Sequence, residues 1–343
     1  MATATSPAAI TATGLRKSYG DKVVLDGIDL DIAEGTIFSL LGPNGAGKTT
    51  AVQILSTLIR ADGGEMRVAG HDPARQPDAV RAAIGVTGQF SAVDNLLTGE
   101  ENLTLMADLH HLGRAEGRRR AAELLERFDL VEAAMKTAAT YSGGMRRRLD
   151  LAMTLVGDPR IIFLDEPTTG LDPRSRLTMW QIIRRLANDG VTIFLTTQYL
   201  DEADRLADRI AVLDQGRLVA VGTAAELKRR VPGGHIRLKL ADTAALDAAA
   251  RALDDSTRDD DALTLQVPAD GSARSLRNLL DRLDAAGVEV DELSVHTPDL
   301  DDVFFALTGR TAAETTPTTD PAPIDPAPTN PAPTDPAEKE PAR

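Results

Sequence analysis

Residues 40–50 read LLGPNGAGKTT, and this stretch decides the fold of the 343-residue chain. Residues 42–49 fit the pattern G-x-x-x-x-G-K-[ST], with an apolar run at 36–41 before them and a helical stretch at 51–58 after them. In such a loop the backbone N–H groups curl around phosphate oxygens, and the helix N-terminus adds partial positive charge. A glycine turn with an incidental lysine is the alternative, but the flanking strand and helix favour a phosphate-binding loop.

The residue types of this loop predict how it holds a nucleotide. Lys48 is expected to bridge the β- and γ-phosphates of ATP, and the Thr49 hydroxyl is expected to ligate Mg²⁺. ATP and Mg²⁺ are therefore the expected cofactors. The residues predicted to contact the nucleotide here are Gly42, Pro43, Asn44, Gly45, Ala46, Gly47, Lys48, Thr49 and Thr50.

A second apolar run, at 161–164, ends in two carboxylates, Asp165 and Glu166. A P-loop enzyme needs such a pair: we expect Asp165 to hold the Mg²⁺ shell and Glu166 to act as general base on the attacking water. Two carboxylates at a strand end could instead cap a helix. The P-loop earlier in the chain favours the catalytic interpretation.

Strand-like and helical patterns alternate from residue 8 to residue 225, which predicts an α/β domain of the P-loop NTPase type. Strands are expected at 23–32 and 191–196 as well as before the two motifs, and ligands bind beyond the carboxyl ends of strands in open α/β sheets. Residues 209–221 look like a hairpin that turns at 214–216 and closes this domain.

The pattern changes after this domain. Residues 226–310 alternate short strands with helices, among them a helix at 275–286 and a last one at 299–307, which predicts a small α+β accessory domain. It shows no catalytic constellation, so packing or dimerisation is its expected role. Residues 311–343 are rich in Pro, Thr, Ala and acidic residues and should form a disordered tail. A PxxP ligand for a partner domain is the alternative for the tail.

Composition excludes several classes of protein. No run approaches the roughly 18 apolar residues of a membrane helix, so we expect neither a membrane-spanning nor a secreted protein. The absence of cysteine excludes disulfides and thiolate chemistry and fits a reducing compartment. A net charge of -14 disfavours nucleic-acid binding. The histidines show no metal-ligand spacing: His71, His110, His111, His235 and His296.

Residues 141–155 read YSGGMRRRLDLAMTL, which resembles the signature helix of ATP-binding cassette (ABC) ATPases. The resemblance covers residues 8–225 and implies a helical subdomain that carries this helix. It also implies that Tyr19 stacks on adenine and that Gln89 reaches Mg²⁺ and the attacking water and contacts the membrane subunit. Asp172 is implied to communicate between two subunits.

The signature departs from the commonest LSGGQ, because Tyr141 replaces Leu and Met145 replaces Gln. The remaining Ser142, Gly143 and Gly144 offer N–H groups and a hydroxyl to a γ-phosphate at a helix N-terminus. In the family, that phosphate belongs to nucleotide on the opposite subunit. One P-loop and one signature in this chain therefore imply an ATP-dependent homodimer.

Two further stretches, 170–176 and 196–210, and the end of the accessory domain resemble the antibiotic-exporter branch of the family, the daunorubicin-resistance type. The resemblance implies an ATPase that works with a separate membrane permease, peripheral on the cytoplasmic face of the membrane, and exports a hydrophobic drug or antibiotic. Alternatives are a regulatory module with little hydrolysis, an exporter of a lipid or other non-drug substrate, or a nucleic-acid-associated ABC ATPase.

Gln198 occupies the position where most ABC ATPases have a histidine that contacts the γ-phosphate. Its amide offers a donor and an acceptor, which covers most of the hydrogen bonding of a neutral histidine. It cannot carry a charge or shuttle a proton. We expect hydrolysis to survive if Glu166 is the base and Gln198 only senses the γ-phosphate; a site that binds ATP and hydrolyses it poorly is the alternative.

Overall fold

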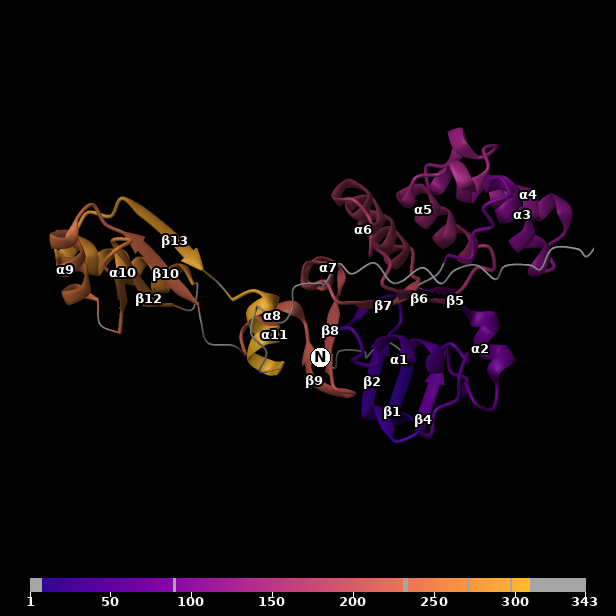
Figure 1. The fold of residues 1–343 in the computed structure, drawn as a ribbon, viewed down its shortest axis with the longest axis horizontal. Coiled ribbons are helices and arrows are strands. Elements are labelled where there is room, and N and C mark those ends of the chain that lie inside the picture. Colours follow the sequence, from indigo (N-terminus) through magenta and orange to yellow (C-terminus); the bar gives the residue numbers. More distant parts are fainter. Residues whose placement is uncertain are drawn as a thin grey trace, which may run out of the picture. The chain divides into compact units, whose positions relative to one another are not determined.

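The computed structural model describes residues 8–88, 91–230, 234–253, 255–269, 272–296 and 298–308. Its centre is a six-stranded sheet in the order β5-β6-β7-β3-β8-β9 (Figure 1). The strand β8 pairs in parallel with β3. It pairs antiparallel with β9, which forms the predicted hairpin. The strands are β3 (Ile37–Leu41), β5 (Ile84–Thr87), β6 (Ile161–Asp165), β7 (Thr192–Thr197), β8 (Arg209–Asp214) and β9 (Arg217–Gly222).

The central strands are buried on both faces, because alternate residues of each strand enter different cores. Ile162 and Leu164 of β6 pack into one hydrophobic cluster, and Ile161 and Phe163 pack into another. The sheet therefore separates two layers, with α5 and α6 on one side and α1 on the other (Figure 1).

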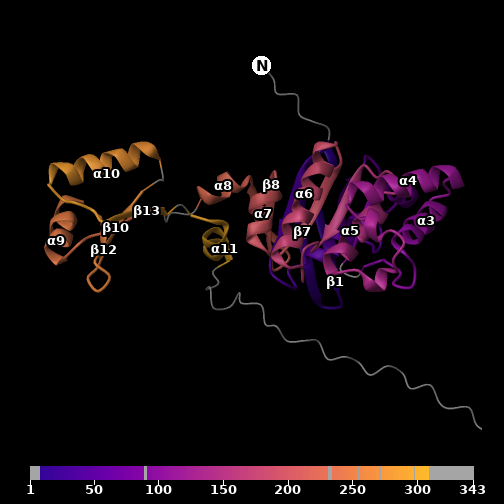
Figure 2. The same cartoon turned by 90° about the horizontal axis from the view of Figure 1, so that it is seen from above.

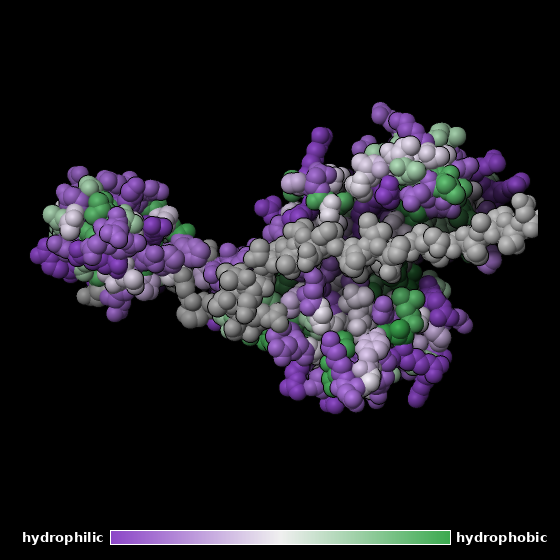
Figure 3. Space-filling model, viewed as in Figure 1, coloured by the Kyte–Doolittle hydropathy of each residue, from purple (hydrophilic) through white to green (hydrophobic). Residues whose placement is uncertain are grey.

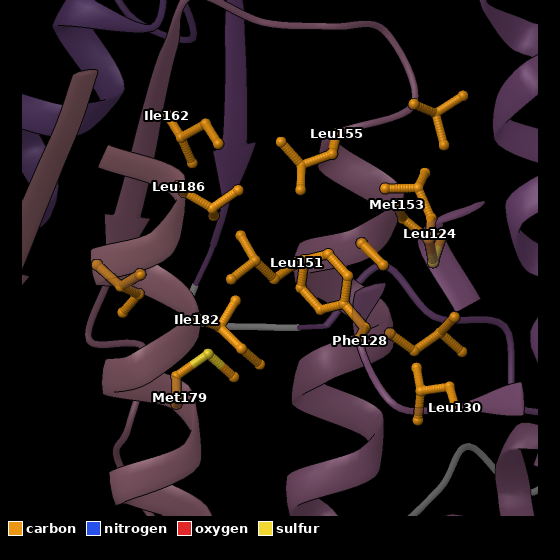
Figure 4. Packing of buried hydrophobic residues seen from close by; sticks show 14 of the residues in the cluster. Leu124, Phe128, Leu130, Leu151, Met153, Leu155, Ile162, Met179, Ile182 and Leu186 are labelled. Atoms are coloured by element: carbon orange, nitrogen blue, oxygen red, sulfur yellow. The ribbon is translucent and has the colours of Figure 1, made fainter. Parts of the chain in front are cut away.

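Several helices around this sheet begin at a residue whose side chain caps them. Thr98 and Glu101 form a capping box at the start of α3, and Asp172 caps α6. In the helical layer, Phe128, Leu151 and Ile182 belong to one cluster (Figure 4). The helices are α1 (Lys48–Leu55), α2 (Pro77–Ala83), α3 (Gly99–Leu109), α4 (Arg114–Arg127), α5 (Gly143–Thr154), α6 (Pro173–Asn188), α7 (Leu200–Leu206) and α8 (Ala224–Lys228), with short turns η1 (Val131–Ala133) and η2 (Ala138–Thr140).

A separate antiparallel sheet contains the expected strand at 23–32. Its order is β2-β1-β4, from β1 (Ala8–Tyr19), β2 (Lys22–Ala33) and β4 (Gly63–Val68). Residues of β1 and β2 share a core with α1 and with one face of the central sheet. The alternation pattern predicted the strand but not this second sheet, because strand patterns do not specify pairing partners.

Residues 235–296 contain an α+β unit with its own core. Four antiparallel strands lie in the order β11-β12-β10-β13, and Leu238, Leu246 and Leu279 pack between sheet and helices. Figure 2 shows α10 running alongside this sheet. The elements are β10 (His235–Lys239), α9 (Thr243–Ala252), β11 (Thr257–Asp259), β12 (Thr264–Pro268), α10 (Ala273–Ala285) and β13 (Glu292–His296).

The last described helix, α11 (Leu300–Thr308), does not contribute to that core. Leu300, Val303 and Phe304 are buried in a cluster with Leu41 of β3 and Val212 of β8. The predicted tail, 311–343, lies outside the described residues. Within the described part, no helix is both long enough and apolar enough to cross a membrane.

Candidate functional site

The P-loop leaves the central sheet at the end of β3. The Gly42 N–H donates to the Thr197 carbonyl at 3.2 Å, which ties the loop to the end of β7. Gly47 precedes α1 with φ = 112°, and a Cβ there would lie 2.8 Å from the Val24 carbonyl oxygen. Because a side chain is excluded on both grounds, this position requires glycine. Pro43, Asn44, Gly45 and Ala46 complete the loop, and Lys48, Thr49 and Thr50 form the first turn of α1.

Lys48 is buried at the centre of the site. Its Nζ donates to the carbonyl oxygens of Gly42 at 2.8 Å and Pro43 at 3.1 Å, and lies 3.3 Å from Glu166 Oε1. Burial lowers the pKa of Lys48, while the nearby Glu166 and Asp165 carboxylates oppose that shift. The P-loop cation and the two predicted carboxylates are thus brought together, as the sequence motifs require.

Glu166 has a left-handed backbone, with φ = 51°. This conformation is uncommon for a residue with a side chain, and such residues cluster at functional sites. The Glu166 N–H donates to the Thr196 carbonyl at 3.1 Å, and the Thr169 hydroxyl donates to Glu166 Oε2 at 3.3 Å. The turn therefore holds the carboxylate beside Lys48 through bonds from both the neighbouring strand and its own loop.

Asp165 ends β6 and is buried, and its Oδ1 accepts a hydrogen bond from the Thr196 hydroxyl at 2.5 Å. The Asp165 carboxylate and the Thr49 hydroxyl at the start of α1 offer oxygen ligands, the type that Mg²⁺ prefers. Neither Asp165 nor Glu166 caps a helix: that role belongs to Asp172, so the helix-cap alternative does not describe this pair.

Gln198 lies between β7 and α7, one residue after Thr197. Because β7 is adjacent to both β3 and β6, the end of β7 lies beside the P-loop and the two carboxylates. The Tyr199 N–H donates to the Thr197 hydroxyl at 2.9 Å, which fixes the turn that carries Gln198. The structure thus places this glutamine at the edge of the sheet where the other predicted catalytic groups lie.

The signature begins α5. Ser142 is the N-cap, and its hydroxyl accepts a hydrogen bond from the Met145 N–H at 3.2 Å. Gly143 and Gly144 form the first turn, and a Cβ on Gly144 would lie 2.4 Å from the Ser175 hydroxyl. Tyr141 is buried and donates from its phenol to the Ala133 carbonyl at 2.7 Å, a bond that the commoner leucine could not make.

Asp172 accepts hydrogen bonds from the Ser175 N–H at 3.0 Å and the Ser175 hydroxyl at 2.5 Å, so its carboxylate is fixed within its own chain. Tyr19, at the end of β1, is 51% exposed, and the Lys17 ammonium lies 5.4 Å from its ring centroid. Gln89 lies outside the described residues.

Glu202 is a fully buried carboxyl that sequence patterns did not single out. Its Oε1 accepts hydrogen bonds from the Thr168 hydroxyl at 2.8 Å and from Trp180 Nε1 at 2.9 Å. Burial raises the pKa of Glu202. Glu202 lies four residues after Gln198, and Trp180 is the only tryptophan of the chain. Neither fact predicts that Glu202 and Trp180 are in contact.

Two family models match different parts of this chain. A family model described as "ABC transporter" matches residues 25–169, and one described as "ATP-binding protein DrrA1-3-like, C-terminal domain" matches residues 222–308. The chain is 51% identical over 303 residues to daunorubicin resistance ATP-binding protein DrrA3 of Streptomyces coeruleorubidus, covering 88% of this chain and 96% of that protein.

Two other similarities agree with this one. The chain is 48% identical over 309 residues to daunorubicin/doxorubicin resistance ATP-binding protein DrrA of Streptomyces peucetius, covering 89% of this chain and 93% of that protein. A solved structure described as the ATP binding subunit of an ABC transporter superposes with a TM-score of 0.58 and 28% identity, over 65% of this chain and 92% of that one.

Proposed function

Because this chain belongs to the family of ABC transporter ATP-binding proteins, in the branch of the daunorubicin-resistance proteins, we propose that it powers the export of a hydrophobic drug or antibiotic through a separate membrane subunit. The chain is an ATPase subunit that binds ATP. The drug class, the Mg²⁺ ion, the dimer and the membrane partner are parts of the proposal. The observation that carries its catalytic part is the Lys48–Glu166 contact at 3.3 Å.

Hydrolysis is proposed to begin when a γ-phosphate accepts hydrogen bonds from Lys48. The phosphate then competes with Glu166 for the lysine, and the released carboxylate can take a proton from the attacking water. Asp165 and Thr49 would hold Mg²⁺, which neutralises charge on the phosphates. The left-handed backbone of Glu166 and its bonds to Thr196 keep the carboxylate near this position.

Gln198 is proposed to position the γ-phosphate through its amide N–H, without taking a proton. Support comes from its place two residues after Thr196, whose hydroxyl binds Asp165. Positioning and electrostatic stabilisation supply most of the catalysis in phosphoryl transfer, so a neutral donor can replace a histidine if another residue is the base.

The complete site is proposed to need two chains. The helices α1 and α5 cover opposite faces of the central sheet, so the P-loop and the signature of one chain start from different layers. In the proposed dimer, Ser142, Gly143 and Gly144 of one chain cover ATP that is held by Lys48 of the other. Tyr19 would contact the adenine from its exposed position at the end of β1.

A membrane partner is proposed to contact the helical layer and the sequence region around Gln89, with the chain peripheral on the cytoplasmic face. Large hydrophobic side chains of the helical layer and its loops are exposed: Leu96 is 85%, Met135 75% and Leu109 64% exposed. Part of the hydrophobic surface in Figure 3 lies over this layer. Exposed hydrophobic surface can mark a site of protein interaction. The net charge of -14 argues against nucleic acid as a partner.

The test of the catalytic proposal is ATP hydrolysis by the chain purified in detergent from membranes of its own cells, so that a membrane subunit stays bound. Glu166→Gln keeps the size of the side chain and removes the base. We expect kcat to fall at least about 100-fold, with ATP still bound. If the wild type binds ATP but hydrolyses it no faster than Glu166→Gln, the chain is a regulatory ATP-binding module instead.

The drug class is tested separately in cells. Deletion of the gene should raise sensitivity to an anthracycline such as daunorubicin, and the wild-type chain should restore resistance where Glu166→Gln does not. Unchanged sensitivity beside normal ATP hydrolysis would refute the drug assignment and favour a lipid or other non-drug substrate.

A further inference from the structure

Arg147, the fifth residue of the signature helix α5, donates hydrogen bonds to backbone carbonyls of two segments that are distant in sequence. Its Nε donates to the Pro167 carbonyl at 2.9 Å, and its Nη2 donates to the carbonyls of Asp165 at 3.2 Å and Glu166 at 3.3 Å. Its Nη1 donates to the Gly88 carbonyl at 3.0 Å. The planar guanidinium thus holds the turn that carries Asp165 and Glu166 and, at the same time, Gly88, the first residue after β5.

Asp150, one helical turn further along α5, completes this arrangement. Its Oδ2 lies 3.3 Å from Arg147 Nη1, and its Oδ1 accepts a hydrogen bond from the Ala92 N–H at 3.0 Å. The side chains of Arg147 and Asp150 are 13% and 3% exposed. Burial raises the pKa of Asp150, and the Ala92 N–H and the Arg147 guanidinium oppose that shift.

The neighbouring Arg148 provides a contrast within the same helix. Its Nη1 donates to the carbonyls of Phe128 at 2.9 Å and Asp129 at 3.2 Å, and its side chain is 17% exposed. Phe128 and Asp129 follow α4, so Arg148 fastens α5 within the helical layer. Both arginines therefore bind carbonyls while nearly buried, but Arg147 alone of the two reaches the end of β6.

From this geometry we infer that Arg147 and Asp150 are a positioning pair, which makes the placement of Glu166 depend on Gly88 and Ala92. Gly88 and Ala92 lie in the sequence region where the proposed function puts the membrane contact, so the inference rests on that function. A shift of either residue relative to α5 changes the bonds available to Arg147, and with them the support of the Glu166 turn. The pair thereby links the state of the membrane subunit to hydrolysis.

Arginine is required here because of its shape. Its rigid fork donates in several directions at once, whereas a lysine ammonium on a flexible chain can keep the charge but not the planar set of bonds. Small displacements of a catalytic group can cost large factors in rate, even when the substrate still binds. Loss of the fork should therefore lower kcat more than it changes the affinity for ATP.

The test compares Arg147→Lys with Arg148→Lys in the detergent-purified complex, by kcat, by binding of a fluorescent ATP analogue and by thermal unfolding. We expect kcat to fall about tenfold in Arg147→Lys and to stay within about twofold of wild type in Arg148→Lys, with analogue affinity within about twofold in both. Asp150→Asn, which keeps an acceptor for Ala92, should lower kcat in the same direction. Its effect should not add to that of Arg147→Lys, because both changes act on one pair.

Equal losses of kcat in the two lysine variants, or an unchanged kcat in Arg147→Lys, would overturn the inference. If Arg147→Lys does not fold, Asp150→Asn decides: an unchanged kcat would overturn it as well. The wild type and Glu166→Gln separate the two levels of proposal. If the wild type hydrolyses ATP no faster than Glu166→Gln, the proposed function is overturned and this inference with it. If the wild type is at least about 100-fold faster than Glu166→Gln, but Arg147→Lys and Asp150→Asn keep the wild-type kcat, the inference alone is overturned.

Discussion

Gln198 limits the chemistry of the proposed active site, because its side chain can donate a hydrogen bond but cannot hold a proton near neutral pH. Its turn follows β7, whose Thr196 hydroxyl binds Asp165 and whose Thr197 carbonyl binds the P-loop. The strand therefore binds the P-loop and a carboxylate, and Gln198 follows it directly, which is the basis for its proposed role as a γ-phosphate donor.

Substitution of Gln198 separates positioning from proton transfer. Gln198→Ala should lower kcat about 100-fold, the effect of removing one preorganised donor, while ATP affinity changes little. Gln198→His should retain activity, because it restores a donor. Both are measured as kcat and analogue binding in the detergent-purified complex. Full activity in Gln198→Ala would show that the γ-phosphate does not depend on this side chain.

For single residues, the sequence predicted the side chains of the site but not the contacts that hold them in place. Lys48, Asp165 and Glu166 were predictable because each occupies a fixed offset within a local motif. The positive φ of Glu166 and the buried Glu202 were not, because each depends on distant contacts. Thr168 and Glu202, for example, are 34 residues apart, and no local pattern encodes their hydrogen bond.

Among the elements, the start of α5 is fixed by its neighbour α6 as well as by its own cap. Asp172 caps α6 and binds the Ser175 hydroxyl, and that hydroxyl lies where a side chain on Gly144 would extend. The second signature glycine is therefore needed for packing within the chain, in addition to any role toward a phosphate. Its sequence motif predicts only the phosphate role.

Gly144→Ala should destabilise the region around α6 by about 1–2 kcal/mol, because the clash with Ser175 outweighs the better helix propensity of alanine. Ser175→Gly removes the clashing atoms, so in that background Gly144→Ala should cost close to nothing. Urea unfolding of the wild type, the two single variants and the double variant can be followed by the fluorescence of Trp180, the only tryptophan, which lies on α6 itself. If the changes in the free energy of unfolding from Gly144→Ala and Ser175→Gly simply add in the double variant, the two positions are not in direct contact.

The strands illustrate how far a local pattern reaches. Residues 209–221 form the predicted hairpin because its two strands are adjacent in sequence. The strand predicted at 23–32 instead joins a separate antiparallel sheet, with pairing to β1 that its own residues do not specify. The cluster that joins Phe304 of α11 to Leu41 of β3 was unpredictable for the same reason, since the partners lie near opposite ends of the chain.

The whole molecule raises the question of how many chains form one catalytic site. Helix α5, which starts with the signature, and helix α1, which starts with Lys48, pack on opposite faces of one sheet. A symmetric pair of chains can bring the signature of each against the P-loop of the other, which yields two equivalent sites. A site formed within one chain makes a different prediction for mixed dimers.

Mixed dimers of Lys48→Ala and Ser142→Asp chains, isolated through a different affinity tag on each chain, distinguish the two arrangements. Aspartate can still cap α5, so Ser142→Asp should keep the helix and repel a phosphate by its charge. If sites form between chains, the mixed dimer has one intact site, which combines Lys48 of the Ser142→Asp chain with Ser142 of the Lys48→Ala chain. The mixed dimer should then recover up to about half of wild-type hydrolysis, while each parent dimer stays inactive. If sites form within one chain, both are damaged and the mixed dimer should be as inactive as its parents. Recovery therefore requires that Lys48 of one chain and Ser142 of the other act on the same nucleotide.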